Sequence, residues 1–66
     1  MTENDRRRMK IAAKEIFQKI AVYSRENRKG NFTKAQDAFD ESEKIKKKAE
    51  KETPGFTQWY YYERNA

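Results

Sequence analysis

The sequence has no cysteine and no histidine, and only two glycines and one proline. Without cysteine the chain has no disulfide, thiolate nucleophile or Cys-based zinc site, and without histidine it lacks the usual imidazole base and the commonest metal ligand. The two glycines form no glycine-rich phosphate loop, because each falls where a helix is expected to end. We therefore expect a protein that is not an enzyme and has neither a cofactor nor a metal site.

Large apolar side chains are scarce as well. Hydrophobic residues make up 35% of the 66 residues and include no leucine, whereas charged residues make up 41%. A single core in a chain this short rarely supplies more than about 3–5 kcal/mol. We therefore expect one small domain over residues 1–66 that depends on a partner, most simply on a second copy in a homodimer.

Long apolar runs are also missing. No stretch approaches the roughly 18 residues of a membrane span, and residues 1–10 lack the apolar centre of a secretory signal. A chain of this size would rarely enclose the pocket of about 300 Å³ from which small-ligand sites start. We expect a cytoplasmic protein with no membrane contact and no small-molecule substrate.

The strongest pattern present is an apolar stripe with helical spacing in the first half of the chain. It predicts a helix over about 3–29, with Thr2 or Asn4 as the N-terminal cap and Gly30 as a left-handed C-terminal cap. The stripe consists of Met9, Ala13, Ile16, Ile20 and Tyr23, widened by Ala12 and Phe17.

A second helix is expected over about 33–52. Thr33 and Gln36 have the spacing of a capping box, and Pro54 with Gly55 ends the pattern. Its inward positions hold mainly small residues, with Phe39 and Ile45 the larger ones, so this helix can approach the first closely but can bury little of it. Since residues 30–32 form a short connection, the two helices should be antiparallel.

The segment 53–66 is rich in aromatic residues, with five of the nine in the chain between Phe56 and Tyr62. It is too short for periodicity to separate an extended segment from a last helical turn. The expected fold is therefore all-α: a two-helix antiparallel hairpin closed by an aromatic C-terminal segment and paired as a dimer.

The charge is distributed unevenly. Residues 1–30 carry nine basic and four acidic side chains, whereas residues 31–66 carry seven of each, so the formal net charge of +5 belongs to the first helix. A basic flank beside an apolar stripe suits contact with phosphates or with an acidic protein surface. The candidate residues for binding nucleic acid or an acidic partner are Arg6, Arg7, Arg8, Lys10, Lys14, Arg25 and Arg28.

The aromatic segment permits two interpretations. It closes the open side of the hairpin, or it forms a protein-binding hot spot, since Trp, Tyr and Arg dominate such surfaces. Four consecutive aromatic residues cannot all point inward, and two apolar residues of the first helix face away from its stripe. The candidate protein-interface residues are therefore Trp59, Tyr60, Tyr61, Tyr62, Ile11 and Val22.

These features favour a small regulatory or accessory protein that binds nucleic acid or a nucleoprotein complex through the basic face of its first helix. The alternative is a protein-binding inhibitor or adaptor that places its basic N-terminus and aromatic segment on a host enzyme or nuclease complex. Small size, basicity and the lack of a catalytic set suit a factor from a phage or other mobile element.

Overall fold

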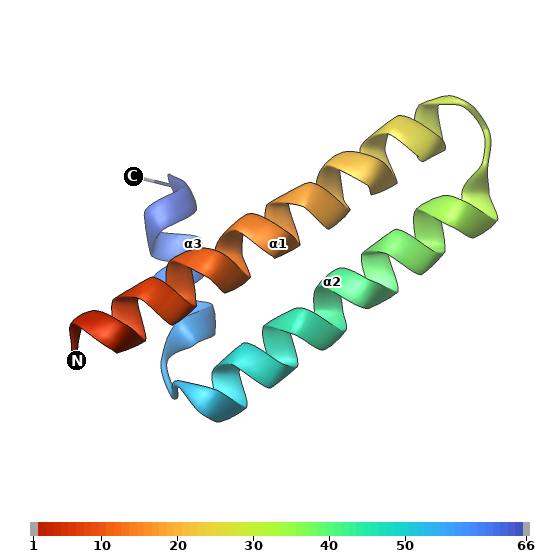
Figure 1. Ribbon diagram of the computed structural model, residues 1–66. Helices are drawn as coiled ribbons and strands as arrows, with labels where there is room; N and C mark the ends of the chain where they lie inside the picture. The colour runs from red at the N-terminus through yellow and green to blue at the C-terminus, as the bar shows by residue number, and fades with distance from the viewer. Residues whose placement is uncertain (1, 66) are drawn as a thin grey trace.

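The computed structural model describes residues 2–65, which form three α-helices and no strand. Helix α1 spans Glu3–Arg28, α2 spans Phe32–Glu52 and α3 spans Phe56–Asn65. α1 and α2 lie antiparallel, and α3 crosses α1 near the end of the pair that holds both termini (Figure 1). The all-helical class is confirmed, but the expected count of two helices is wrong because the aromatic segment is itself a helix.

Both ends of α1 are capped by local hydrogen bonds. The Thr2 hydroxyl accepts from the Asp5 backbone N–H at 3.2 Å, and the Asp5 carboxylate accepts from the Thr2 N–H at 3.3 Å, which together form a capping box. At the other end Gly30 adopts φ +83°, and the N–H of Asn31 donates to the Glu26 carbonyl at 2.9 Å. This left-handed turn reverses the chain and leads directly into α2.

The start of α2 differs from the prediction. The helix begins at Phe32 with Asn31 as its N-cap, and the Asn31 carbonyl accepts from the Ala35 N–H at 3.0 Å. No side-chain hydrogen bond caps this end, and the Asn31 side-chain amide donates to the Glu26 carboxylate at 2.8 Å. The capping box expected at Thr33 and Gln36 is therefore wrong, and the turn at Gly30 sets the start of the helix.

The core lies where α1 and α3 cross. Met9 and Ile16 of α1 pack with Phe56 and Tyr60 of α3, and all four are buried. The Phe56 and Tyr60 rings are stacked, with centroids 6.0 Å apart and an interplanar angle of 23°. The aromatic segment therefore supplies half of this cluster, as expected for a segment that closes the open side of the helix pair.

The α1–α2 contact relies on small side chains. Ala35, Ala38 and Ser42 are the buried residues of α2, and the Ser42 hydroxyl donates to the Phe39 carbonyl at 2.6 Å. Near the turn, the rings of Tyr23 and Phe39 pack with centroids 5.5 Å apart. Small residues allow a close approach but bury little apolar area, which explains why the main core forms against α3.

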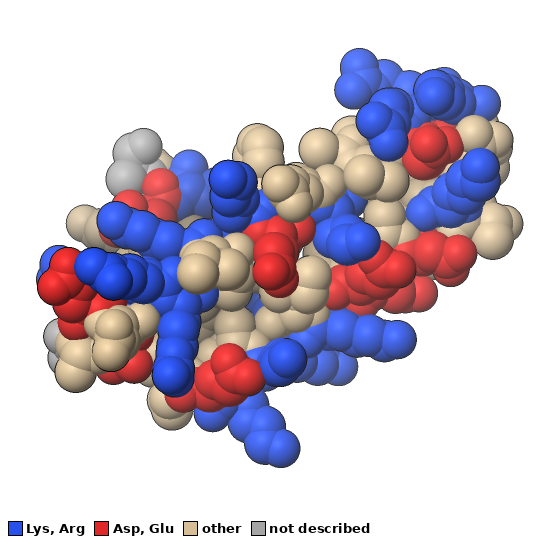
Figure 2. Space-filling model, in the orientation of Figure 1, with Lys and Arg blue, Asp and Glu red and all other residues tan. Residues whose placement is uncertain are grey.

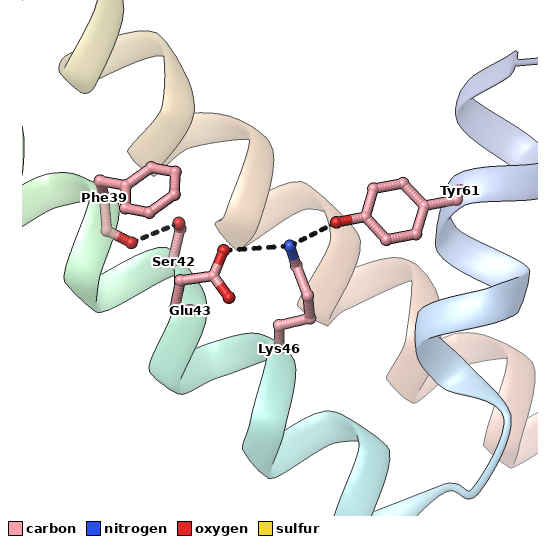
Figure 3. Close-up of polar contacts among 5 residues, drawn as sticks. All are labelled: Phe39, Ser42, Glu43, Lys46 and Tyr61. Carbon is pink, nitrogen blue, oxygen red and sulfur yellow. Dashed lines mark hydrogen bonds and ion pairs between the residues drawn. The ribbon is translucent and has the colours of Figure 1, made fainter.

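Two side chains of α2 hold α3 in place. The Glu50 carboxylate accepts from the backbone N–H groups of Gly55, at 2.6 Å, and Thr57, at 2.9 Å. One turn earlier, the Lys46 ammonium donates to the Tyr61 hydroxyl at 2.8 Å and to Glu43 at 3.3 Å (Figure 3). These polar contacts fix the direction in which α3 leaves α2.

Candidate nucleic-acid interface

Most of the predicted basic residues lie along one outer edge of α1. Since successive residues of a helix are about 100° apart, five of them fall within a sector of roughly 60°. All five are exposed. The residues on this edge are Arg7, Lys10, Lys14, Arg25 and Arg28.

Arg6 and Arg8 lie on different sides of α1. Arg6 lines a shallow surface cleft together with Glu3, Arg7 and Lys10, and so extends the basic edge. Arg8 points to the other side of α1, where it borders the groove between α1 and α2. The predicted basic face therefore does not include Arg8, because three consecutive residues of a helix cannot share one side.

The basic edge is divided into two groups. Figure 2 shows Lys and Arg side chains gathered at both ends of α1, with mainly uncharged surface along the outer edge between them. Eleven residues separate Lys14 from Arg25, which is about 16 Å along the helix axis. We call Arg6, Arg7, Lys10 and Lys14 the N-terminal basic cluster, and Arg25 with Arg28 the C-terminal pair.

Acidic neighbours affect these groups unequally. A Glu3 carboxylate oxygen lies 3.6 Å from the Arg7 guanidinium in an exposed pair, which is weak. A Glu26 carboxylate oxygen lies 3.8 Å from Arg25 Nε, and this largely buried side chain also accepts from the Asn31 amide. Within residues 2–65, neither Lys10 nor Lys14 takes part in an ion pair. Lys10 and Lys14 therefore carry no acidic partner in the described part of the chain, and neither does Arg28 at the far end of the edge, whose Nε donates to the Ser24 carbonyl at 3.4 Å.

The N-terminus of α1 is already occupied by its own carboxylate. The backbone N–H of Thr2 and the hydroxyl of Thr2 hold the pKa of Asp5 below its ordinary value. The Asp5 carboxylate also interacts favourably with the positive end of the helix dipole. An external phosphate would meet this negative charge at the helix end, so the side chains farther along α1 are the better anion ligands.

A groove between α1 and α3 begins beside Lys14. Its volume is about 380 Å³, and it is open to solvent along its length. The Phe17 side chain on its α1 wall is 69% exposed. The residues that line this α1–α3 groove are Ala13, Lys14, Phe17, Trp59, Tyr60, Glu63 and Arg64.

The position of Phe17 corrects the expected apolar stripe. Phe17 lies about 80° around the helix from Met9, at the border of the basic edge. α2 packs on the opposite border of the stripe, and α3 crosses α1 nearer its N-terminus, so neither helix covers the ring. Phe17 and Arg64 are site residues that the sequence did not reveal, because only the placement of α3 brings them beside Lys14.

The four aromatic residues expected at an interface have four different environments. Tyr60 is 6% exposed and belongs to the core, so it is not available to a partner. Trp59 is half-buried and packs against Phe56, with ring centroids 5.9 Å apart. Tyr61 uses its hydroxyl on Lys46 (Figure 3), whereas Tyr62 is 73% exposed.

Lys46 is a structural cation rather than part of the basic edge. Partial burial lowers its pKa, but hydrogen bonds to Tyr61 and Glu43 outweigh that effect and leave the pKa of Lys46 above its ordinary value. Its ammonium also lies 5.0 Å from the Tyr61 ring centroid. Lys46 therefore stays charged at neutral pH and is engaged within the chain.

The two isolated apolar residues of α1 also differ. Ile11 is 60% exposed and lines a groove of about 280 Å³ between α1 and α2, whereas Val22 is half-buried and lies outside it. The residues that line this α1–α2 groove are Arg8, Ile11, Ala12, Glu15, Ile45, Lys48, Ala49 and Glu52. By helical position it lies on the side of α1 opposite the α1–α3 groove.

Two kinds of feature are absent from the described part of the chain. Residues 2–65 contain no group of three or more acidic side chains placed to hold a metal ion. None of the three helices combines the length and the apolar character required to cross a membrane.

Comparisons with family models, with curated proteins and with solved structures found no match to this chain.

Proposed function

We propose that this protein binds nucleic acid without catalysing a reaction, as a small regulatory or accessory factor. The observation that carries the proposal is the pair Lys10 and Lys14, which lie on one exposed edge of α1 without an acidic partner within residues 2–65. Arg6, Arg7 and, from α3, Arg64 surround them. Five cations on one side of the molecule favour phosphate as the partner, since phosphate contacts supply most of the affinity of non-specific complexes.

The salt dependence of binding follows from this count. In a plot of the logarithm of the binding constant against the logarithm of the salt concentration, each phosphate contact contributes a slope of about −0.7 for a single strand and about −0.9 for duplex DNA. Five contacts therefore predict a slope of about −3.5 for a single strand.

A charge-matched pair of variants tests the proposal by fluorescence anisotropy of labelled oligonucleotides across a salt series. Lys10→Gln with Lys14→Gln should weaken binding and reduce the slope by about 1.4, because two phosphate contacts are lost. The control, Lys44→Gln with Lys47→Gln, removes the same charge from exposed positions of α2 and should retain nearly the full slope. Equal losses in both variants would show that net charge, rather than this edge, determines binding.

The outer side of α3 favours the second candidate, a protein-binding inhibitor or adaptor. Tyr62 is exposed and Tyr61 is partly exposed beside it, and tyrosine is enriched among residues that dominate protein interfaces. The N-terminal basic cluster would then face an acidic surface of the partner. In the salt series above, the absence of binding to any single-stranded or duplex oligonucleotide would favour this function over the first.

We further propose that two copies associate through the α1–α2 groove. Its lining combines four apolar residues with two basic ones, Arg8 and Lys48, and two acidic ones, Glu15 and Glu52. Two positive and two negative groups beside apolar residues can pair with the same surface on a second copy related by a two-fold axis. Such an arrangement would cover Ile11 and leave the basic edge of each copy exposed.

A further inference from the structure

We infer that the α1–α3 groove holds an unpaired base of a single-stranded nucleic acid. This inference rests on the proposed function and specifies its ligand. The groove joins exposed aromatic surface, from Phe17 and the half-buried Trp59, to the cations Lys14 and Arg64. Proteins that bind single strands combine these two features, a basic track for the phosphates and aromatic rings on which bases stack.

The charges around the groove determine which part of a nucleotide enters it. Lys14 and Arg64 come from different helices, and Lys10 lies one turn before Lys14 on the same edge. These cations can bind the phosphates on both sides of one nucleotide. Glu63 also lines the groove, and its carboxylate repels phosphate but accepts hydrogen bonds from amino groups on base edges. The base therefore enters the groove and the phosphates remain at its rim.

The aromatic walls provide the stacking surface. The Phe17 ring is largely exposed, so a base can cover it without displacing any part of the core. Trp59 is held in place by its contact with Phe56 and forms the α3 wall. The bases of a duplex are already stacked and paired, so they cannot enter such a groove. We therefore expect tighter binding to a single strand than to a duplex of the same sequence at equal salt.

Two exposed phenylalanines provide a matched test. Phe17 and Phe32 are 69% and 67% exposed, but Phe32 lies at the start of α2, beside the turn and outside the groove. Phe17→Ala should weaken binding of a single-stranded oligonucleotide of mixed sequence by roughly 5- to 150-fold, the loss of stacking for one base. Phe32→Ala should leave the affinity unchanged. Circular dichroism of both variants checks that the helices are retained.

Trp59 supplies a second, direct measurement. It is the only tryptophan in the chain and lines the groove, so its emission has no contribution from another tryptophan. Titration of the unlabelled wild-type protein with the same single strand should change that emission, because a base then lies next to the indole. The duplex should bind with little change in emission.

The outcomes separate the inference from the proposed function. If the single strand binds but Trp59 emission stays constant and Phe17→Ala behaves like Phe32→Ala, the base site is wrong and nucleic-acid binding stands. If neither single strand nor duplex binds at low salt, both proposals are wrong. Selective weakening by Phe17→Ala together with a change in Trp59 emission supports both.

Discussion

Glu50 joins the end of α2 to the start of α3 through hydrogen bonds from two backbone N–H groups. The N–H groups of Thr57 and then Gly55 hold the pKa of Glu50 below its ordinary value of 4.5. Since the pKa is lower in the folded chain than in the unfolded chain, the stabilisation is complete above about pH 4.5 and is lost as the pH falls through the folded value.

Glu50→Gln should therefore lower the melting temperature at neutral pH by a few degrees, because the amide keeps only one acceptor oxygen for two N–H donors. The difference from wild type should shrink as the pH falls below 4.5, where the wild-type carboxylate becomes protonated. Thermal unfolding followed by circular dichroism between pH 3 and pH 7 measures both effects. Asp37→Asn, at an exposed position of the same helix outside the α1–α2 groove, is the control and should shift the melting temperature little. A pH-independent deficit in Glu50→Gln would contradict the assigned role.

Other individual residues show where sequence patterns fail. The pairing of Lys46 with Tyr61 joins residues fifteen positions apart on different helices, and no local spacing indicates it. Phe17 has the spacing of a core residue, yet it is exposed because no helix covers that border of α1. Burial at the edge of an apolar stripe depends on where the neighbouring helices lie. The residues of the stripe carry no information about that placement.

At the scale of elements, the two long helices were predictable and the third was not. α1 spans Glu3–Arg28 against an expected 3–29, and α2 spans Phe32–Glu52 against an expected 33–52. Both are long enough for several periods of the pattern to be read. α3 has ten residues, five of them aromatic, and so few positions do not separate one periodicity from another. The expected start of α2 followed the capping-box spacing at Thr33, whereas the turn at Gly30 begins the helix one residue earlier, at Phe32.

The structural importance of α3 can be measured with one buried and one exposed aromatic residue. Phe56 is fully buried against Met9, Ile16 and Tyr60, so Phe56→Ala should cost about 3–5 kcal/mol. A core in a chain this short rarely supplies more than about 3–5 kcal/mol, so the variant should lose most of its cooperative unfolding transition. Tyr62→Ala, on the exposed side of the same helix, should change the free energy of unfolding by less than about 0.5 kcal/mol.

Chemical denaturation followed by far-ultraviolet circular dichroism measures these two free energies of unfolding. A Phe56→Ala variant that unfolds like wild type would show that α1 and α2 are stable without the docked third helix. That result would contradict the placement of the core at the crossing of α1 and α3.

At the scale of the whole molecule, the two sides of α1 have different chemistry. The α1–α3 groove joins the basic edge, whereas the lining of the α1–α2 groove carries balanced charges. The sequence located the excess charge on the first helix and identified Lys10 and Lys14. Helical periodicity alone separates Arg8 from the basic edge, whereas only the packing of α3 brings Arg64 beside Lys14.

The balanced charges around the α1–α2 groove predict that two copies of the chain associate through it. A stable interface buries about 800 Å² on each partner, and the molecule, with extents of 42 × 23 × 15 Å, offers a long face of sufficient size. We expect sedimentation equilibrium to give about twice the 8.0 kDa of one chain at high protein concentration. Ile11→Asp should shift the equilibrium to the monomer, because it places a carboxylate among the apolar residues that the interface would bury.

Ala21→Asp is the matched control for this experiment, since it adds the same charge to an exposed position within the basic edge, about 80° around α1 from Ile11 and outside the α1–α2 groove. It should leave association unchanged while weakening nucleic-acid binding. Ile11→Asp, by contrast, should weaken association. If Ile11→Asp and wild type both sediment as monomers at every concentration, the groove does not pair two copies. If Ala21→Asp dissociates the dimer and Ile11→Asp does not, the interface lies on the basic edge, where it would compete with nucleic acid.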